Sequence, residues 1–448
     1  MKRYEKYKAI NLPWLSEIPI HWALNRNKAF LKESKDVVGE SSKDYNLLSL
    51  TKSGIIPRDV ASGKGKFPSD FSTYKIICPG DMVFCLFDID ETPRTVGLSS
   101  HHGMLTGAYD VFHVTAISSK YMLYYYLALD DVKAMRPLYK GLRKTINVDT
   151  FLGTKLPVPP RDEQDQIVRY LDWQVSKINR LIAAKRKRIE LLNQTIAYNL
   201  ERIICEGMHG EELVETGNPW ISTAPKSWNK LRHKNILTEK RIVVGDTYSQ
   251  YTLLSLTTKG IIVRDISSGK GKFPSDFSTY QVVQPSDMVF CLFDVDETPR
   301  TVGLSAYTGM ITGAYTVYET HDVLPEFLLH YFTAIDNKKG FKPLYSGLRK
   351  VIGKDVFSRQ SIYLPSVEEQ KEIVAAIDAS QKKCKKAMDL FEQEIIALTD
   401  LRTRLISDVV TGQIDVRGIE ITDDERAEEF TFPDNTEEES EDIADEEE

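Results

Sequence analysis

The sequence predicts an α+β protein made of two homologous globular domains, separated by two long helices that form an antiparallel coiled coil with pseudo-two-fold symmetry. Two observations predict this architecture. The thirteen residues SGKGKFPSDFSTY occur at positions 62–74 and again, 206 residues later, at positions 268–280. Each copy of the surrounding domain then ends at a proline-containing junction, which is followed by roughly 40 residues with coiled-coil spacing.

The repeat covers whole domains and not only one loop. Residues 47–99 match residues 253–305 at 42 of 53 positions. Identical polar loops are not explained by packing, because a shared core needs only a shared apolar pattern. Recent duplication and a shared recognition task are the two explanations, and we favour the second. The same offset of 206 relates Trp14, Pro19, Trp22 and PLYKGLRK at 137–144 to Trp220, Pro225, Trp228 and PLYSGLRK at 343–350.

Each domain has the same order of elements. An opening segment with two tryptophans leads into strands and loops. The run DMVFCLFD at 81–88 is short, apolar and rich in Val and Phe, which predicts a buried strand. The run KYMLYYYLALDDV at 120–132 predicts a helix. The domain ends at KLPVPPRDEQ in the first copy and at YLPSVEEQ in the second.

The two long helices show an apolar seam with steps of three, four and seven residues. Prolines precede each helix, and acidic residues lie near its positive N-terminal end. Two such helices in one chain are expected to pair with each other as a spacer of about 60 Å. The seam residues are Ile167, Leu171, Val175, Ile178, Ile182, Ile189, Leu192, Ile196 and Ile203, and then Ile373, Ile377, Cys384, Ala387, Phe391, Leu398, Leu401 and Leu405.

These features predict five segments. They are a first domain at 1–160, a first spacer helix at 161–207, a second domain at 208–366, a second spacer helix at 367–417 and an acidic tail at 418–448. Residues 419–448 hold 16 Asp and Glu and one Arg, a net charge of −15. The whole chain carries −7, so subtracting the tail leaves +8 on the rest. A basic body suits a polyanionic partner, whereas the tail is expected to be disordered.

The composition excludes several classes of protein. Five scattered cysteines without a C-x-x-C pair indicate a reduced, cytoplasmic protein without disulfides or a zinc site. No apolar run suggests a signal peptide or a membrane span. There is no Walker A loop and no H-E-x-x-H motif. His101 and His102 are replaced by Tyr307 and Thr308 in the second copy, so they are not part of the repeated design.

The acidic stretch DIDETPR at 88–94 recurs as DVDETPR at 294–300. It is a candidate metal or nuclease site, but three close carboxylates before Thr-Pro more often form a capped turn with an internal arginine partner. We therefore expect no catalytic residue and no bound metal or other cofactor in this chain.

The repeated loops carry the residue types that bind nucleic acid. Glycines allow close approach of a backbone, lysines neutralise phosphates, and hydroxyl groups fix the register of the protein on the duplex. Arg94 and Arg300 are candidates for base edges or for local carboxylates. The predicted DNA-binding residues are Lys64, Lys66, Ser69, Tyr74, Arg94, Arg143 and Lys144 in the first domain, and Lys270, Lys272, Ser275, Tyr280, Arg300, Arg349 and Lys350 in the second.

The chain resembles a known family, the specificity subunits of type I restriction–modification enzymes. The resemblance covers roughly residues 10–418. It rests on PWLSEIPIHW at 13–22, LPVPPRDEQDQIVRYLD at 156–172, LPSVEEQKEIV at 364–374 and LISDVVTGQIDVR at 405–417. The second junction has one proline where the first has three, and the acidic tail is not part of the family pattern.

The resemblance implies two target-recognition domains, each of which reads one half of a split site in double-stranded DNA. It also implies that the spacer helices dock two modification subunits, which use S-adenosylmethionine to methylate adenine, and that a restriction and translocation subunit completes the enzyme. Because the two domains are nearly alike, we expect an interrupted palindrome. Two alternatives remain, namely a nuclease that uses the acidic stretches and an adaptor that binds proteins.

Overall fold

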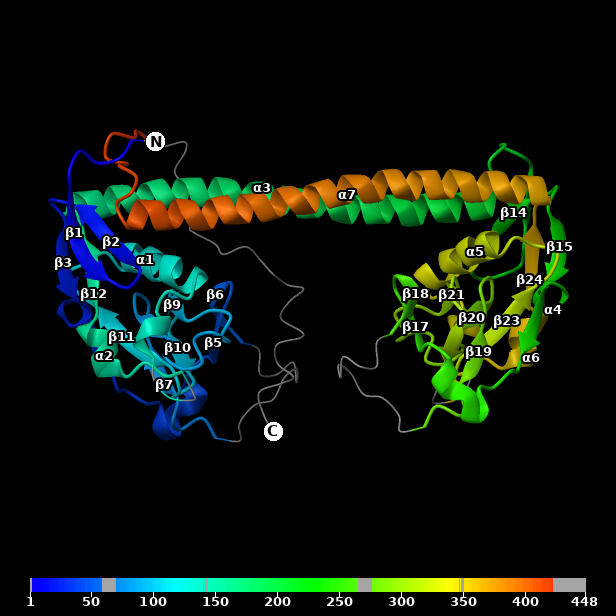
Figure 1. The fold of residues 1–448 in the computed structure, drawn as a ribbon, viewed down its shortest axis with the longest axis horizontal. Helices are drawn as coiled ribbons and strands as arrows, with labels where there is room; N and C mark the ends of the chain where they lie inside the picture. Colours follow the sequence, from blue (N-terminus) through cyan, green and yellow to red (C-terminus); the bar gives the residue numbers. More distant parts are fainter. Residues whose placement is uncertain are drawn as a thin grey trace. The chain divides into compact units, whose positions relative to one another are not determined.

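The computed structural model describes residues 2–58, 70–139, 141, 144–264, 276–345, 347 and 350–421. It divides into two compact units, each with its own core (Figure 1). Unit 1 comprises residues 1–187 and 391–448, and unit 2 comprises residues 188–390. Each unit therefore contains the first part of one long helix and the last part of the other.

Unit 1 is built on a four-stranded antiparallel sheet with the order β4-β11-β8-β9. Four two-stranded pairs surround it. β1-β2 and β5-β6 are pairs of consecutive strands, whereas β7-β10 and β3-β12 join strands that are not consecutive in the chain. The strands are β1 (Tyr7–Leu12), β2 (Leu15–Pro19), β3 (Ala23–Arg26), β4 (Leu31–Ser34), β5 (Leu48–Thr51), β6 (Gly54–Pro57), β7 (Lys75–Ile77), β8 (Met82–Phe84), β9 (Val96–Leu98), β10 (Gly103–Leu105), β11 (Asp110–Val114) and β12 (Lys155–Val158). The short helices are η1 (Asn27–Ala29), η2 (Gly39–Asp44), α1 (Ser119–Asp131), η3 (Arg136–Leu138) and α2 (Val148–Gly153).

Unit 2 repeats this order, with the sheet β16-β23-β20-β21 and the pairs β13-β14, β15-β24, β17-β18 and β19-β22. Its strands are β13 (Leu213–Glu215), β14 (Thr223–Pro225), β15 (Asn229–Arg232), β16 (Leu237–Lys240), β17 (Leu254–Thr257), β18 (Gly260–Val263), β19 (Gln281–Val283), β20 (Met288–Phe290), β21 (Val302–Leu304), β22 (Gly309–Ile311), β23 (Thr316–Thr320) and β24 (Ser361–Leu364). Its short helices are α4 (His233–Ile236), η4 (Gly245–Gln250), α5 (Pro325–Asn337), η5 (Lys342–Leu344) and α6 (Lys354–Arg359).

The core of each unit lies between its sheet and the apolar helix that follows β11 or β23. In unit 1 this helix is α1, which begins where the Ser118 hydroxyl accepts a hydrogen bond from the Tyr121 amide. Residues 121–130 of α1 are all buried, because the helix is covered by the sheet on one side and by the long helices on the other. The rings of Phe84, Phe112, Tyr126 and Phe151 meet at 4.6–5.8 Å between centroids.

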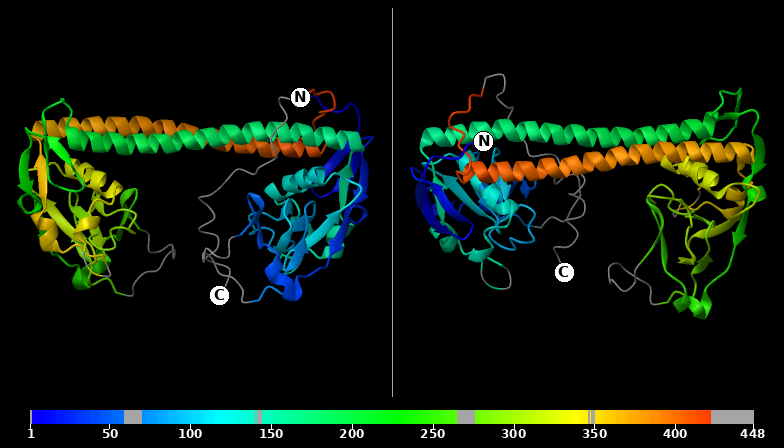
Figure 2. Two further views of the ribbon diagram at one scale, coloured as in Figure 1. Left: turned by 180° about the vertical axis from the view of Figure 1, so that it is seen from behind. Right: turned by 45° about the horizontal axis from the view of Figure 1, so that its top comes forward.

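The two long helices are α3 (Arg161–Glu206) and α7 (Val367–Val410). Each is followed within two residues by a glycine with positive φ, Gly207 or Gly412. Glycine adopts this backbone conformation readily because it has no side chain. In unit 1 they lie side by side and antiparallel (Figure 2). Asn179 accepts a hydrogen bond from Arg402, and Lys185, further along α3, pairs with Glu394, which comes earlier in α7. In unit 2, Ile203 and Ile204 of α3 share a core with Ile373 and Ile377 of α7.

These observations confirm the predicted fold class, with one error in the seam. Leu401 is 53% exposed, although its spacing placed it in the seam. Arg402 lies there instead, and its guanidinium bonds to Asn179. Burial lowers the pKa of Arg402. The polar pair of Arg402 and Asn179 thus occupies the helix contact that the spacing had assigned to Leu401. Steps of three and four residues do not distinguish between two adjacent residues of a helix.

A polar clamp joins the start of each long helix to its own domain. In unit 1 the Glu163 carboxylate accepts a hydrogen bond from the Trp22 indole at 3.0 Å. Next to it, Gln164 accepts from the Ser118 amide at 2.8 Å and donates to the Pro159 carbonyl at 2.9 Å. In unit 2, Trp228 donates to Glu369 at 3.1 Å, and Gln370 bridges the Leu324 amide and the Pro365 carbonyl in the same way.

Unit 1 also includes the last described residues of the chain. The Asp415 amide donates to the Lys2 carbonyl at 3.0 Å, and Gln166 of α3 donates to the carbonyls of Val416 and Ile419. Val416 is fully buried. The segment after α7 therefore completes the domain that begins at the other end of the sequence. Among the described residues, no helix is long and apolar enough to span a membrane.

Candidate nucleic-acid interface

Eight of the fourteen predicted DNA-binding residues lie outside the described residues. They are Lys64, Lys66, Ser69, Arg143, Lys270, Lys272, Ser275 and Arg349. The other six are Tyr74, Arg94, Lys144, Tyr280, Arg300 and Lys350, and the structure places them at three kinds of position.

Tyr74 lies at the end of the repeated loop, just before β7, where its ring packs edge-on against Phe71 with centroids 5.0 Å apart. Burial raises the pKa of Tyr74 above its usual value. Its backbone carbonyl accepts a hydrogen bond from the Val38 amide, so the residue is fixed at both its ring and its backbone. Tyr280 packs on Phe277 in the same way, also at 5.0 Å. Each tyrosine anchors one end of a repeated loop.

The acidic stretch after β8 forms a turn in both units. The Asp88 carbonyl accepts hydrogen bonds from the amides of Glu91 and Thr92, at 3.0 and 2.8 Å. Asp88 itself has φ of 43°, a left-handed conformation that Asp tolerates better than most residues. Asp294 has φ of 46° and repeats the turn in unit 2. We call residues 88–92 and 294–298 the acidic turns.

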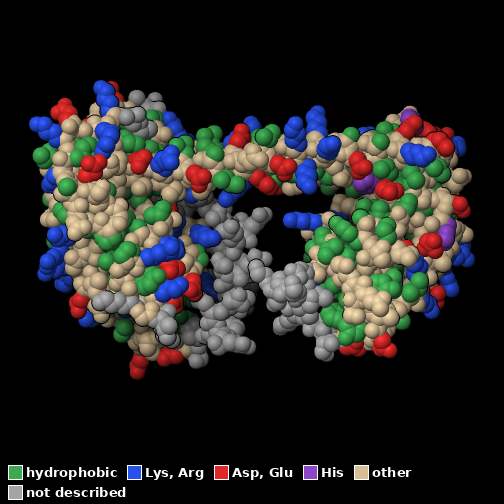
Figure 3. All heavy atoms as spheres, viewed as in Figure 1, with side chains coloured by type: hydrophobic (Ala, Val, Ile, Leu, Met, Phe, Trp, Pro, Cys, Tyr) green, Lys and Arg blue, Asp and Glu red, His purple; other side chains and the backbone are tan. Residues whose placement is uncertain are grey.

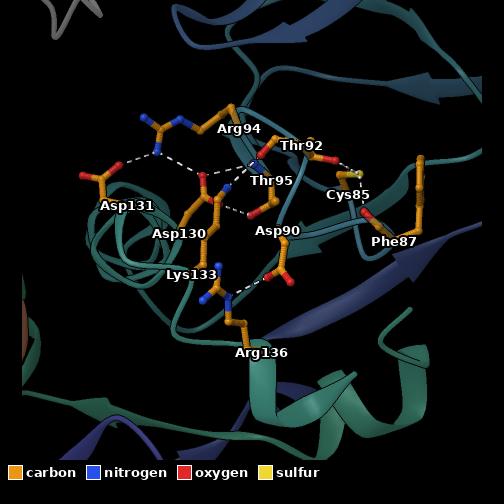
Figure 4. Close-up of polar contacts among 10 residues, drawn as sticks. All are labelled: Cys85, Phe87, Asp90, Thr92, Arg94, Thr95, Asp130, Asp131, Lys133 and Arg136. Carbon is orange, nitrogen blue, oxygen red and sulfur yellow. Dashed lines mark hydrogen bonds and ion pairs between the residues drawn. The ribbon is translucent and has the colours of Figure 1, made fainter. Parts of the chain in front are cut away.

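The Asp90 carboxylate is the centre of the first acidic turn (Figure 4). It accepts from the Arg136 Nε at 2.7 Å and from the Tyr139 hydroxyl at 3.1 Å, and the Lys144 ammonium lies 3.4 Å away. Burial by itself would raise the pKa of Asp90, but these three donors more than compensate, so its pKa lies below the usual range. The turn is thus tied to the loop that follows η3.

Lys144 and Lys350 face these turns. Lys144 Nζ lies 2.9 Å from a Glu91 oxygen, and Lys350 Nζ lies 2.7 Å from a Glu297 oxygen and 3.2 Å from Asp296. Hydrogen bonds from the lysines to these carboxylates raise the pKa of both ammonium groups, so they stay charged. The stretch therefore forms a turn, as expected. Its arginine partner in unit 1 is Arg136 and not the Arg94 within it, and in unit 2 Lys342 stands in the place of Arg136.

Arg94 bonds to carboxylates at the end of α1 (Figure 4). Its guanidinium lies 3.1 Å from Asp130 and 2.9 Å from Asp131, and its side chain is 15% exposed. Arg300 repeats this contact with Asp336 at 3.2 Å. Arg94 and Arg300 therefore pair with carboxylates at the ends of α1 and α5, and not with those of their own acidic stretch. Contact of these arginines with base edges stays a prediction.

Two features of the site were missed from the sequence. Asp130 is almost fully buried and also accepts from the Thr95 amide and hydroxyl and from Lys133 Nζ, at 3.1, 2.6 and 2.8 Å. In addition, the rings of Phe87 and Tyr109 stack at 6.0 Å, and Phe293 and Tyr315 do the same in unit 2. The identity of these residues between the copies was the available signal, but their pairing joins segments far apart in sequence.

The surface of unit 1 mixes charges of both signs. In the view of Figure 3, both Lys and Arg and Asp and Glu side chains are scattered over the described residues of this unit. Among the described residues, no group of three or more His, Cys, Asp or Glu side chains is arranged to hold a metal ion.

Comparisons with known proteins agree on one family. Residues 108–191 and 302–390 each match the family model of the type I restriction modification DNA specificity domain. Each match runs from the central part of one domain into its long helix. The chain is 22% identical, over 90% of its length and 96% of the other, to a Methanocaldococcus jannaschii protein named as the specificity subunit of the type I restriction enzyme MjaX.

One solved structure shares the fold. A chain from a study of complex assembly and conformational transition of the type I restriction–modification system matches 89% of this chain and 99% of its own length, with a TM-score of 0.61 and 13% identity. The HsdS subunit from Thermoanaerobacter tengcongensis matches 89% of this chain and 98% of its own length at 16% identity, with a TM-score of 0.44, which is too low to support an argument.

Proposed function

Because the chain belongs to the family of type I restriction–modification specificity subunits, we propose that it is the non-catalytic subunit that reads the DNA sequence for such an enzyme. Its two domains each read one half of a bipartite site. The observation that carries this proposal is the duplication itself, since two matches to the DNA specificity domain lie in two units with the same strand order.

The near identity of the two domains supports an interrupted palindrome as the site. Residues 47–99 and 253–305 differ at only 11 of 53 positions, and the lysine–glutamate pairs of the acidic turns and the ring contacts of the tyrosine anchors recur in both units. Two domains with the same contact surface recognise the same short sequence, so symmetric half-sites follow, as for dimeric DNA-binding proteins.

The helices are the proposed docking site for two modification subunits, which bind S-adenosylmethionine and methylate one adenine in each half-site. This role is supported by large apolar side chains of α3 and α7 that are exposed to solvent, because exposed apolar surface is what a protein partner would cover. Their exposed fractions are 49–65% for Leu181, Leu191, Tyr198, Leu390, Ile396 and Leu401. A restriction and translocation subunit would complete the enzyme.

The nuclease alternative depends on free carboxylates in the acidic turns. Asp90 already accepts hydrogen bonds from Arg136 and Tyr139 and lies beside Lys144. A carboxylate with three cationic or hydroxyl partners is poorly suited to bind a catalytic metal. This observation favours the role of the acidic turn as part of a binding scaffold.

Mapping of modified adenines tests the proposal. Genomic DNA from cells that carry this chain and its modification partner is sequenced by a method that detects N6-methyladenine, alongside DNA from cells that lack the chain. We expect methylation at an interrupted palindrome that disappears without this chain. A methylated site with unlike halves would contradict the palindrome, and an unchanged methylation pattern would contradict the proposed function.

A further inference from the structure

A lysine in each unit pairs with two carboxylates of the acidic turn, and the two carboxylates differ in their surroundings. The Asp90 side chain is 15% exposed and is held by Arg136 and Tyr139. The Glu91 side chain is 73% exposed, and among the described residues it pairs only with Lys144. Asp90 is therefore part of the scaffold, whereas Glu91 is a surface charge that covers one lysine.

Unit 2 repeats this arrangement, except that Lys342 stands at the position of Arg136, 3.8 Å from Asp296. The Glu297 side chain is 72% exposed, and Lys350 Nζ lies 2.7 Å from its oxygen. Asp296 is 17% exposed and accepts from the Tyr345 hydroxyl. A surface ion pair contributes little to stability, so stability alone does not account for its presence in both domains.

The backbone holds each lysine in this position. Lys144 has φ of 43° and Lys350 has φ of 47°. Residues other than glycine seldom adopt this left-handed backbone conformation. Two residues later, the Ile146 amide donates to the Leu86 carbonyl at 2.7 Å, and Ile352 does the same to Leu292 at 2.8 Å. These bonds attach the lysine-bearing loop to the segment between β8 or β20 and the acidic turn, so the lysine and the glutamate are brought together by the fold.

Building on the proposed DNA-binding function, we propose that Glu91 and Glu297 are internal counter-ions that compete with DNA phosphates for Lys144 and Lys350 and so weaken binding to DNA outside the recognised site. The physical basis is the weakness of an exposed ion pair, which a well-placed phosphate can replace. At the recognised site, base contacts fix a phosphate beside each lysine. On other DNA no phosphate is fixed there, so the carboxylate stays in place and repels the duplex.

The test replaces Glu91 and Glu297 by glutamine, which removes the negative charges and keeps side chains of the same size that can form hydrogen bonds. Full-length E91Q/E297Q is compared with the wild-type chain for binding to a labelled 30-base-pair duplex of random sequence, over a range of salt concentrations. An exposed pair is worth about 0.2–1 kcal/mol, so two pairs give a dissociation constant lowered about 2- to 30-fold. Each freed lysine adds about 0.9 to the slope of log affinity against log salt. The double variant D162N/E368Q is the matched control, because it removes two acidic charges from equivalent first-turn positions of α3 and α7 and should have a smaller effect.

A second pair of variants separates local competition from a general change in charge. In chains that carry K144Q/K350Q, the added E91Q/E297Q change should no longer tighten binding, because no lysine remains to be released. The proposal is overturned if wild-type chain binds the duplex in a salt-dependent way and E91Q/E297Q neither tightens binding nor steepens the salt slope. It is also overturned if the gain persists without the lysines. No salt-dependent binding by the wild-type chain to any duplex would instead contradict the proposed function.

Discussion

At the scale of single residues, the two units have different pairs of buried side chains at one equivalent position. In unit 1, buried Asn27 donates to the Phe151 carbonyl and accepts from the Tyr126 hydroxyl, both at 2.7 Å. In unit 2 the equivalent residues are His233 and Phe332, whose rings lie 5.2 Å apart. Among the described residues, neither ring nitrogen of His233 has a hydrogen-bond partner of ordinary geometry. Burial lowers the pKa of His233 to about 4.

This difference predicts that unit 2 is the more acid-sensitive unit. The pKa of an unfolded histidine is about 6.5, so between pH 6.5 and about 4 the unfolded chain binds a proton that the folded unit does not. As the pH is lowered from 6.5 to about 4, the free energy of unfolding of unit 2 should therefore fall by about 1.4 kcal/mol per pH unit. Above pH 6.5 this group should have no effect on it. Hydrogen exchange of β20 peptides at pH 7 and pH 5 measures the change.

The paired variant H233N/F332Y installs the unit 1 solution in unit 2 and serves as the control for this prediction. Because the amide does not titrate, the pH dependence of unit 2 should flatten. The reverse change, N27H/Y126F, should make unit 1 more sensitive to acid. Equal pH slopes for the wild-type chain and H233N/F332Y would show that His233 is not the responsible group.

At the scale of elements, the clamp residues explain why the junction motifs have their sequence. Gln164 is 3% exposed and satisfies two backbone groups that come from α1 and from the loop before α3. We predict that Gln164→Ala lowers the free energy of unfolding of unit 1 by about 2–6 kcal/mol, because two buried backbone groups each lose a partner at about 1–3 kcal/mol. Urea unfolding followed by circular dichroism measures this.

The equivalent change, Gln370→Ala, should act on unit 2. Gln194→Ala is the matched control, since Gln194 lies on the exposed face of α3 and bonds only to Glu190, one turn away, among the described residues. It should change stability by less than about 0.5 kcal/mol. Comparable losses for Gln164→Ala and Gln194→Ala would mean that the clamp has no special role.

The elements also show what could be predicted from the sequence. Apolar spacing gave the long helices, because burial along one helix face depends only on local periodicity. It failed at Leu401, where a polar pair replaces an apolar one. The sequence marked Glu163 and Gln164 as a repeated motif, but not their function. Their partners, Trp22 and Ser118, are distant in sequence and close only after folding. The same reason hid the contacts of Arg94 with Asp130 and of Lys144 with Glu91.

At the scale of the whole molecule, duplication gives each half of the chain an equivalent set of basic residues in its repeated loops. If each domain reads one half-site, the loss of these charges in one domain should affect one half-site only. We predict that K64A/K66A/R143A weakens protection of one half of the methylated site in hydroxyl-radical footprinting and leaves the other half protected. K270A/K272A/R349A should give the mirror result. Removing each side chain that neutralises a phosphate should also reduce the salt slope of binding by about 0.9, so either triple variant can reduce it by up to about 2.7.

The two triple variants control for each other, because they change the same residue types at positions related by the repeat. Their difference is therefore independent of the total charge removed, which is equal in both. Protection that falls equally at both half-sites in each variant would indicate a general electrostatic effect of the basic body. Protection that is unchanged at both would show that the repeated loops do not contact DNA. Only the one-sided, mirrored loss follows from two domains that each recognise their own half of a symmetric site.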